Sequence, residues 1–178
     1  VSYRRPVYHR QSVTLFGSQP KPPSVVFVLD WSVSMEALIK AELPGLEGES
    51  TRMDVAVHAL KTMVADLSRR EQEKPRVGLF FFGHRRAFTS DTKNLVLSRY
   101  ADKFYPPGSP QRRQLEDIAP GEDVERVLSL GDFRASQVGT MRLHLEEVQY
   151  FGLTPLNLAI IQALNEFKKE RDDYNMSV

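Results

Sequence analysis

Three oxygen-bearing side chains alternate along the segment VVFVLDWSVSM, at Asp30, Ser32 and Ser34. Alternate residues of an extended or turning segment can point the same way, so one carboxylate and two hydroxyls can converge on a single point. Oxygen ligands of this kind suit Mg²⁺ or Mn²⁺, because such ions take oxygen ligands and Mg²⁺ keeps several waters. The spacing therefore predicts a divalent-cation site with Asp30, Ser32 and Ser34 as ligands.

The predicted site carries little negative charge. Asp30 is its one anionic residue, so a bound divalent ion would keep much of its positive charge and could accept a carboxylate from another molecule. A second interpretation needs no metal: the three residues can form a turn, with an Asx or helix-capping role, that leads into MEALIK. Both interpretations fit the spacing.

The element before Asp30 favours the metal interpretation. Residues 25–29, VVFVL, form an unbroken apolar run of β-branched and aromatic type, which is typical of a central parallel strand covered on both faces. The carboxyl end of such a strand faces the crevice where α/β proteins bind ligands. Asp30 stands at that end.

Two further segments complete a strand-helix-strand unit. Residues 51–70, TRMDVAVHALKTMVADLSRR, have helical apolar spacing, with Thr51 as the N-cap and Asp54 three residues on, as in a capping box. Residues 76–82, RVGLFFF, form a second buried strand. This order predicts an α/β fold with a Rossmann-like, mostly parallel central sheet flanked by helices.

A second amphipathic helix is predicted over residues 155–170. Its apolar positions share one face: Leu156, Ala159, Ile160, Ala163, Leu164 and Phe167. Thr154 precedes Pro155, so the threonine hydroxyl can simply cap this helix. Because the Asp30 motif is also present, we instead expect Thr154 to contact the metal, directly or through water.

The sequence between these elements gives weaker signals. Residues 84–114 are long for a connection and predict an insertion, with a short helix near NLVLSRYADKF. LEDIA predicts a short strand and EDVERVL a short helix, while MRLHLEEV fits either a strand or a helix. His84, Arg85 and Arg86 predict a solvated basic loop, with contact to an acidic partner as the alternative. Trp31 fits both a side chain packed beside the strand end and the rim of a binding site.

Composition limits the classes of function. With 178 residues, of which 41% are hydrophobic, the chain fits one domain, which we expect over residues 24–178, after a leading strand and linker in residues 1–23. Lys and Arg total 24 and Asp and Glu 23, which gives no field to attract nucleic acid or anionic lipid. No run approaches the roughly 20 apolar residues of a membrane helix. The absence of cysteine excludes thiolate chemistry.

The segment VVFVLDWSVSM resembles the metal-ion-dependent adhesion site motif that opens von Willebrand factor A domains. TRMDVAVHALKTMVADL and RVGLFFFGHRR resemble the next two elements of bacterial members, and FGLTPLNLAIIQAL resembles the segment with the family's metal-binding threonine, Thr154. The resemblance covers residues 24–178. It implies a protein-binding module, not an enzyme, in which Asp30, Ser32, Ser34 and Thr154 hold Mg²⁺ or Mn²⁺ and the metal engages a carboxylate of a protein partner.

The chain departs from the family pattern at its end. The family places a further metal-associated aspartate after another strand, and the sequence stops about where that strand would begin. We therefore expect the metal site to be incomplete and one edge of the sheet to be open.

Two other functions remain open. A haloacid-dehalogenase-like phosphotransferase also has an aspartate after its first strand, with Mg²⁺ beside it. Its second aspartate, two residues on, corresponds to Ser32 here, and a serine cannot act as the general acid at neutral pH. The other alternative is a degenerate module of the same fold that scaffolds an assembly without metal.

Overall fold

A three-stranded sheet forms the centre of the computed structural model, which describes residues 24–69, 75–89 and 94–175. The strands are β1 (Ser24–Asp30), β4 (Arg76–Phe82) and β7 (Val124–Asp132), in the order β1-β4-β7. β1 and β4 are parallel, as predicted, and β7 is antiparallel to β4. The protein is therefore a mixed α/β protein with a partly parallel sheet.

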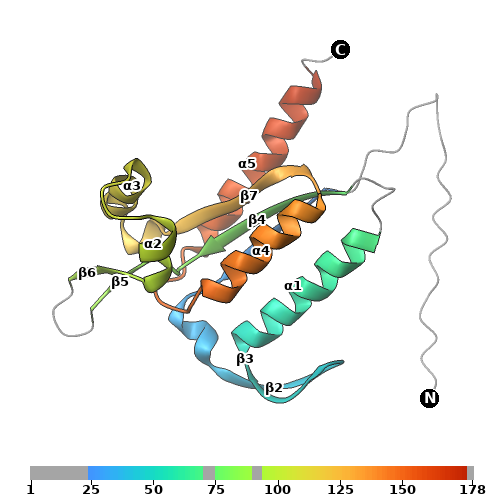
Figure 1. Cartoon of the computed structure of the whole chain (residues 1–178), viewed down its shortest axis with the longest axis horizontal. Helices are drawn as coiled ribbons and strands as arrows, with labels where there is room; N and C mark the ends of the chain where they lie inside the picture. The colour runs from blue at the N-terminus through green and yellow to red at the C-terminus, as the bar shows by residue number, and fades with distance from the viewer. Residues whose placement is uncertain (1–23, 70–74, 90–93, 176–178) are drawn as a thin grey trace.

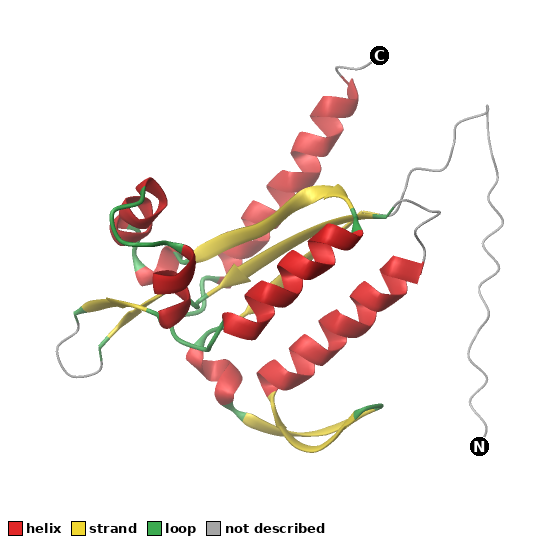
Figure 2. Ribbon diagram, viewed as in Figure 1, coloured by secondary structure: helices red, strands yellow, loops and turns green. Residues whose placement is uncertain are grey.

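Helices cover both faces of this sheet (Figure 1). α1 (Arg52–Arg69) and α4 (Ala135–Glu147) lie side by side on one face, and α5 (Leu156–Asn175) lies on the other. Figure 2 shows the resulting layers, with the strands between the helices. β4 is the central strand, and its side chains from Val77 to Phe82 are all buried because both faces are covered.

The start of α1 is set by local hydrogen bonds. Thr51 Oγ1 accepts from Asp54 N at 3.0 Å, and Asp54 Oδ2 accepts from Thr51 N at 2.9 Å, so the predicted capping box is confirmed. The residues before it form a hairpin, β2 (Leu38–Leu43) and β3 (Leu46–Thr51). MEALIK is therefore not a helix: one 3-10 turn, Val33–Glu36, leads directly into β2.

Two short elements differ from prediction. LEDIA is not a strand, because α3 (Pro110–Asp117) runs into it from a start fixed by Ser109, whose hydroxyl accepts from Arg112 N at 3.1 Å. EDVERVL is not a helix, because its apolar residues belong to β7 and pair with β4. Short apolar runs fit either structure, and contacts distant in sequence decide between them.

Residues 84–114 contain a two-stranded sheet and short helices, which lie beyond one end of the central sheet (Figure 1). Their elements are β5 (Arg86–Phe88), β6 (Leu95–Leu97), α2 (Arg99–Phe104) and the start of α3. The helix near NLVLSRYADKF is thus α2, with β6 before it. MRLHLEEV, for which both structures remained open, is helical and lies at the end of α4.

β1 lies at the edge of the described sheet, whereas its composition predicts a central strand. β4 is its one neighbour in the part of the chain that the structure describes, and the side chains from Val25 to Val28 are only half-buried. The predicted leading strand of residues 1–23 lies outside the described residues.

α5 also presents apolar side chains to solvent. Ala159 and Ala163 are buried, as the helical pattern predicts, but the larger apolar residues of the same predicted face are exposed: Leu156, Ile160, Leu164 and Phe167. Within the described ranges, none of the helices combines the length and apolar character that a bilayer crossing requires.

Candidate metal site

Asp30, Ser32 and Ser34 form a compact turn at the carboxyl end of β1. Asp30 Oδ1 accepts from the Ser32 backbone N–H at 2.7 Å, and the Ser32 and Ser34 Oγ atoms lie 2.9 Å apart. Ser32 is 2% exposed, whereas Ser34 is exposed. The two serine hydroxyls therefore meet at a point that opens to solvent on the Ser34 side.

The separation of the two hydroxyls fits a metal ion. Neighbouring ligands of an octahedral Mg²⁺ ion, each about 2.05 Å from the metal, are separated by roughly 2.9 Å. The Ser32 and Ser34 oxygens have this separation. The Asp30 carboxylate uses Oδ1 for the turn, and its second oxygen remains to contact an ion or one of the ion's waters. The donor set thus suits a hard divalent cation.

The loop that carries Thr154 lies against this turn. Phe151 N donates to Trp31 O at 3.1 Å, and Val33 N donates to Gly152 O at 3.3 Å. Thr154 follows two residues later with an exposed side chain, and its carbonyl accepts from Leu156 N at 2.9 Å, at the start of α5. The structure therefore brings the two serine hydroxyls together and holds the Thr154 loop beside them.

Gly83 allows this close packing. It adopts a φ of 72°, and a Cβ at this position would lie 2.2 Å from Leu153 O and 3.1 Å from Ser32 N. The backbones of the serine turn and of the Thr154 loop therefore meet at one residue of the β4 end. Only glycine fits there, because any side chain would collide with the Leu153 carbonyl.

The prediction of a solvated basic loop at His84, Arg85 and Arg86 is wrong. Their exposed fractions are 0%, 7% and 4%. Arg85 Nε donates to Asp123 Oδ1 at 2.6 Å, and the backbone N–H groups of Arg85 and Arg86 donate to Asp123 Oδ2 at 2.6 and 3.1 Å. Burial disfavours the charge on Arg85, but the charges of Asp123 and Glu125, the interaction with Tyr105 and the hydrogen bond to Asp123 together outweigh this effect and raise the Arg85 pKa. The two basic groups are tolerated inside the protein because they have partners there.

Arg86 fixes the end of a neighbouring helix. Its guanidinium donates to Leu115 O at 2.7 Å and also to the carbonyls of Glu116 and Ile118. These carbonyls lie at the carboxyl end of α3, where a helix leaves its last carbonyls without partners. Arg86 therefore joins β5 to α3.

A second buried carboxylate, Glu125, collects side chains from several elements. Its Oε2 lies 2.6 Å from His84 Nε2 and accepts from Tyr100 OH at 2.8 Å, and Tyr105 OH donates to Oε1. Burial raises the pKa of Glu125, but the hydrogen bond and charge of His84, followed by the charge of Arg85, outweigh it and lower the pKa to about 2. We call these residues the buried polar cluster: His84, Arg85, Tyr100, Tyr105, Asp123 and Glu125.

Sequence reasoning missed Asp123 and Glu125, which lie at the start of a segment assigned to a helix. A usable signal was the pair of adjacent arginines directly after a buried strand, since buried cations require acidic partners.

The buried polar cluster lies at the same end of the sheet as the Asp30 turn, because Gly83 N donates to Asp123 O at 2.9 Å and Gly152 N donates to Gly83 O at 2.8 Å. It supports the site and does not form part of it.

Trp31 belongs to the core. It is 3% exposed and its ring lies 5.5 Å from that of Phe81, which favours the packing interpretation over a binding rim. Elsewhere in the described ranges, no group of three or more His, Asp or Glu side chains is arranged to hold a metal ion. A site built from one carboxylate and several hydroxyls would not have such a group.

No protein-family model, curated protein or solved structure matches this chain. The geometry of the Asp30 turn is therefore the observation from which a function can be argued.

Proposed function

We propose that the chain is a metal-dependent protein-binding module of von Willebrand factor A type, with Mg²⁺ or Mn²⁺ held by Asp30, Ser32, Ser34 and Thr154. The observation that carries this proposal is the 2.9 Å separation of the Ser32 and Ser34 hydroxyls at the carboxyl end of β1. The contact of the Thr154 loop with Trp31 and Val33 supports it. So does the parallel β1–β4 pair, with α1 between the two strands in the sequence.

The charge of the site indicates the kind of partner. One carboxylate and neutral hydroxyls leave most of the charge of a divalent ion uncompensated, and Ser34 opens the site to solvent. A carboxylate from an aspartate or glutamate of a partner protein would complete the coordination. Ser32 stands where a phosphotransferase of the alternative class would need its general acid, and a serine cannot supply that proton at neutral pH, so the proposed activity is binding.

Isothermal titration of the full chain with Mn²⁺ tests the proposal. We expect saturable binding at one site, and Asp30→Ala should weaken it at least tenfold because the only anionic ligand is lost. Asp66→Ala is the matched control: this aspartate is exposed on α1 and pairs with Arg69 at 2.7 Å, away from the turn. Equal affinities of the wild-type protein and Asp30→Ala, or no binding at millimolar Mn²⁺, would overturn the proposal.

One observation favours a metal-free scaffold of the same fold. Asp30 Oδ1 already accepts from the Ser32 backbone N–H in an Asx-type turn, and the Ser32 and Ser34 hydroxyls already bond to each other, with no ion needed to hold them. That alternative predicts an unchanged melting temperature in Mn²⁺. The metal site predicts a higher melting temperature, since at 100 times the dissociation constant a ligand stabilises the folded state by about 2.7 kcal/mol.

A further inference from the structure

A groove of about 720 Å³ separates α1 from α4. Its floor is apolar and comes from both helices, with Leu60 and Val64 on α1 and Met141 and Leu145 on α4. The helices are antiparallel, because α1 leads into the start of β4 whereas α4 begins after Asp132, which pairs with Arg76 at that same start. The groove runs from Leu60 to Arg69, about 14 Å of helix.

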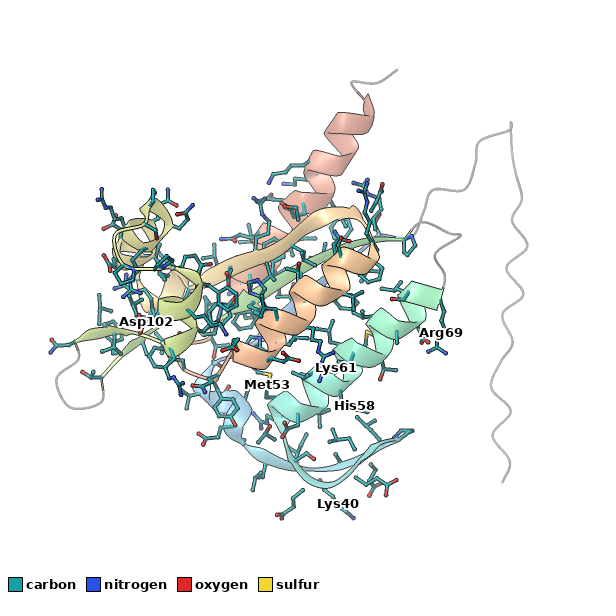
Figure 3. The ribbon with its side chains drawn as sticks, viewed as in Figure 1. Lys40, Met53, His58, Lys61, Arg69 and Asp102 are labelled. Atoms are coloured by element: carbon teal, nitrogen blue, oxygen red, sulfur yellow. The ribbon has the colours of Figure 1, made fainter. Side chains whose placement is uncertain are left out.

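The rim of the groove is mainly basic. Its charged residues are Lys61, Arg69, Arg142 and Glu146. Figure 3 shows Lys61 in the middle of α1 and Arg69 at its end. Arg69 and Arg142 form exposed ion pairs with Asp66 and Glu146, each at 2.7 Å, which contribute little because solvent screens them. The rim thus combines three cations with one anion beside an apolar floor, and with Asp66 next to Arg69 the local net charge is +1.

We propose that this groove binds an amphipathic helix of a protein partner whose apolar stripe is flanked by Glu or Asp. A length of 14 Å corresponds to about two and a half helical turns, enough for apolar anchors at positions i, i+3 or i+4, and i+7. The anchors would lie on Val138 and Leu145 of α4, the partly exposed apolar residues of the groove. Acidic side chains beside them would meet Lys61, Arg69 and Arg142. None of these residues belongs to the Asp30 turn, so the proposal is independent of metal binding.

Fluorescence anisotropy with a defined peptide tests this surface. The probe is a labelled peptide of roughly 14 residues, stapled because short helices are marginal in water, with leucines along one stripe and glutamates beside it. We expect the full chain to bind it with a dissociation constant below about 100 μM. A permuted peptide of the same composition, whose leucines no longer share a face, should bind at least tenfold more weakly, as should a version with lysine for glutamate.

Variants on α1 locate the binding. Ala65 is exposed and lines the groove, so Ala65→Glu places a like charge against the peptide and should weaken binding at least tenfold. Thr62 is exposed on the same helix but does not line the groove, so Thr62→Glu is the matched control and should change the affinity less than twofold. Circular dichroism verifies that both variants are folded.

Four outcomes would overturn the proposal. They are no binding at 1 mM peptide, equal binding of the permuted peptide, equal affinities of Ala65→Glu and Thr62→Glu, and self-association of the chain in place of peptide binding. The first three would show that the groove does not recognise an acidic helix. The last, measured by sedimentation equilibrium, would assign the surface to a second copy.

Discussion

Asp123 is a fully buried carboxylate that holds two arginines. It accepts from Arg85 Nε and from the backbone N–H groups of Arg85 and Arg86 at 2.6 to 3.1 Å. These bonds join the end of β4 to the start of β7, because Asp123 immediately precedes Val124, the residue that pairs with Phe82. A buried charge pair of this kind specifies one arrangement of the chain, since either partner alone would be a charge without compensation.

Asp123→Asn should therefore destabilise the protein by about 3 to 5 kcal/mol, because it removes the carboxylate that directly bonds the buried Arg85 guanidinium. Urea unfolding followed by circular dichroism measures the change. Asp132→Asn, at the exposed opposite end of β7, is the control and should alter the free energy of unfolding by less than about 0.5 kcal/mol. Similar stabilities of the two variants would show that the Arg85–Asp123 pair does not hold β7 in place.

At the scale of elements, the sequence predicted those whose signals are local. The Thr51–Asp54 capping box marks the start of α1, and the apolar runs at residues 25–29 and 76–82 mark β1 and β4. β7 could not be predicted in the same way. Asp123, just before β7, bonds to Arg85, and Glu125 in β7 bonds to His84, in each case about forty positions earlier in the sequence. Periodicity does not report such contacts.

The contact between elements at Gly83 can be tested directly. Gly83→Ala should destabilise the protein by at least about 3 kcal/mol, because a left-handed φ costs a non-glycine residue 1 to 2 kcal/mol and the new Cβ would meet Leu153 O at 2.2 Å. Gly108→Ala separates the two effects, since Gly108 has a φ of 83° and nothing within 4 Å of the added Cβ. It should cost only the 1 to 2 kcal/mol of the backbone. Equal losses would mean that the Thr154 loop does not pack against β4.

At the scale of the whole molecule, the motif at the end of β1 was predicted from sequence, but its surroundings were not. The α/β class, the parallel β1–β4 pair and the position of Asp30 at the carboxyl end of β1 follow from the sequence. The buried polar cluster does not, because it depends on side chains from β4, α2 and β7 meeting in space. The apolar patterns of α5 and β1 also predict more burial than the structure has. Large apolar side chains of α5 are exposed, and β1 lies at the edge of the described sheet.

The cluster also makes stability depend on pH. Glu125 has a pKa lowered to about 2 in the folded protein, against about 4.3 when unfolded, so its ionised form stabilises the fold above pH 4.3. This contribution, of the order of 3 kcal/mol, is lost as pH falls from about 4.3 towards 2. Urea unfolding of wild-type protein and Glu125→Gln should therefore show a difference that is full at pH 6 and smaller at pH 3. A difference that is the same at both values would contradict the ionised state of Glu125.

The location of a bound ion tests the central claim most directly. In crystals of the full chain soaked with Mn²⁺, anomalous scattering should show a peak about 2.1 Å from the hydroxyl oxygens of Ser32 and Ser34, with the Thr154 hydroxyl close enough to reach the ion directly or through one water. The same soak of Asp30→Ala should show no peak at this turn. A wild-type map without density between the two serines, or with the ion bound elsewhere, would contradict the account.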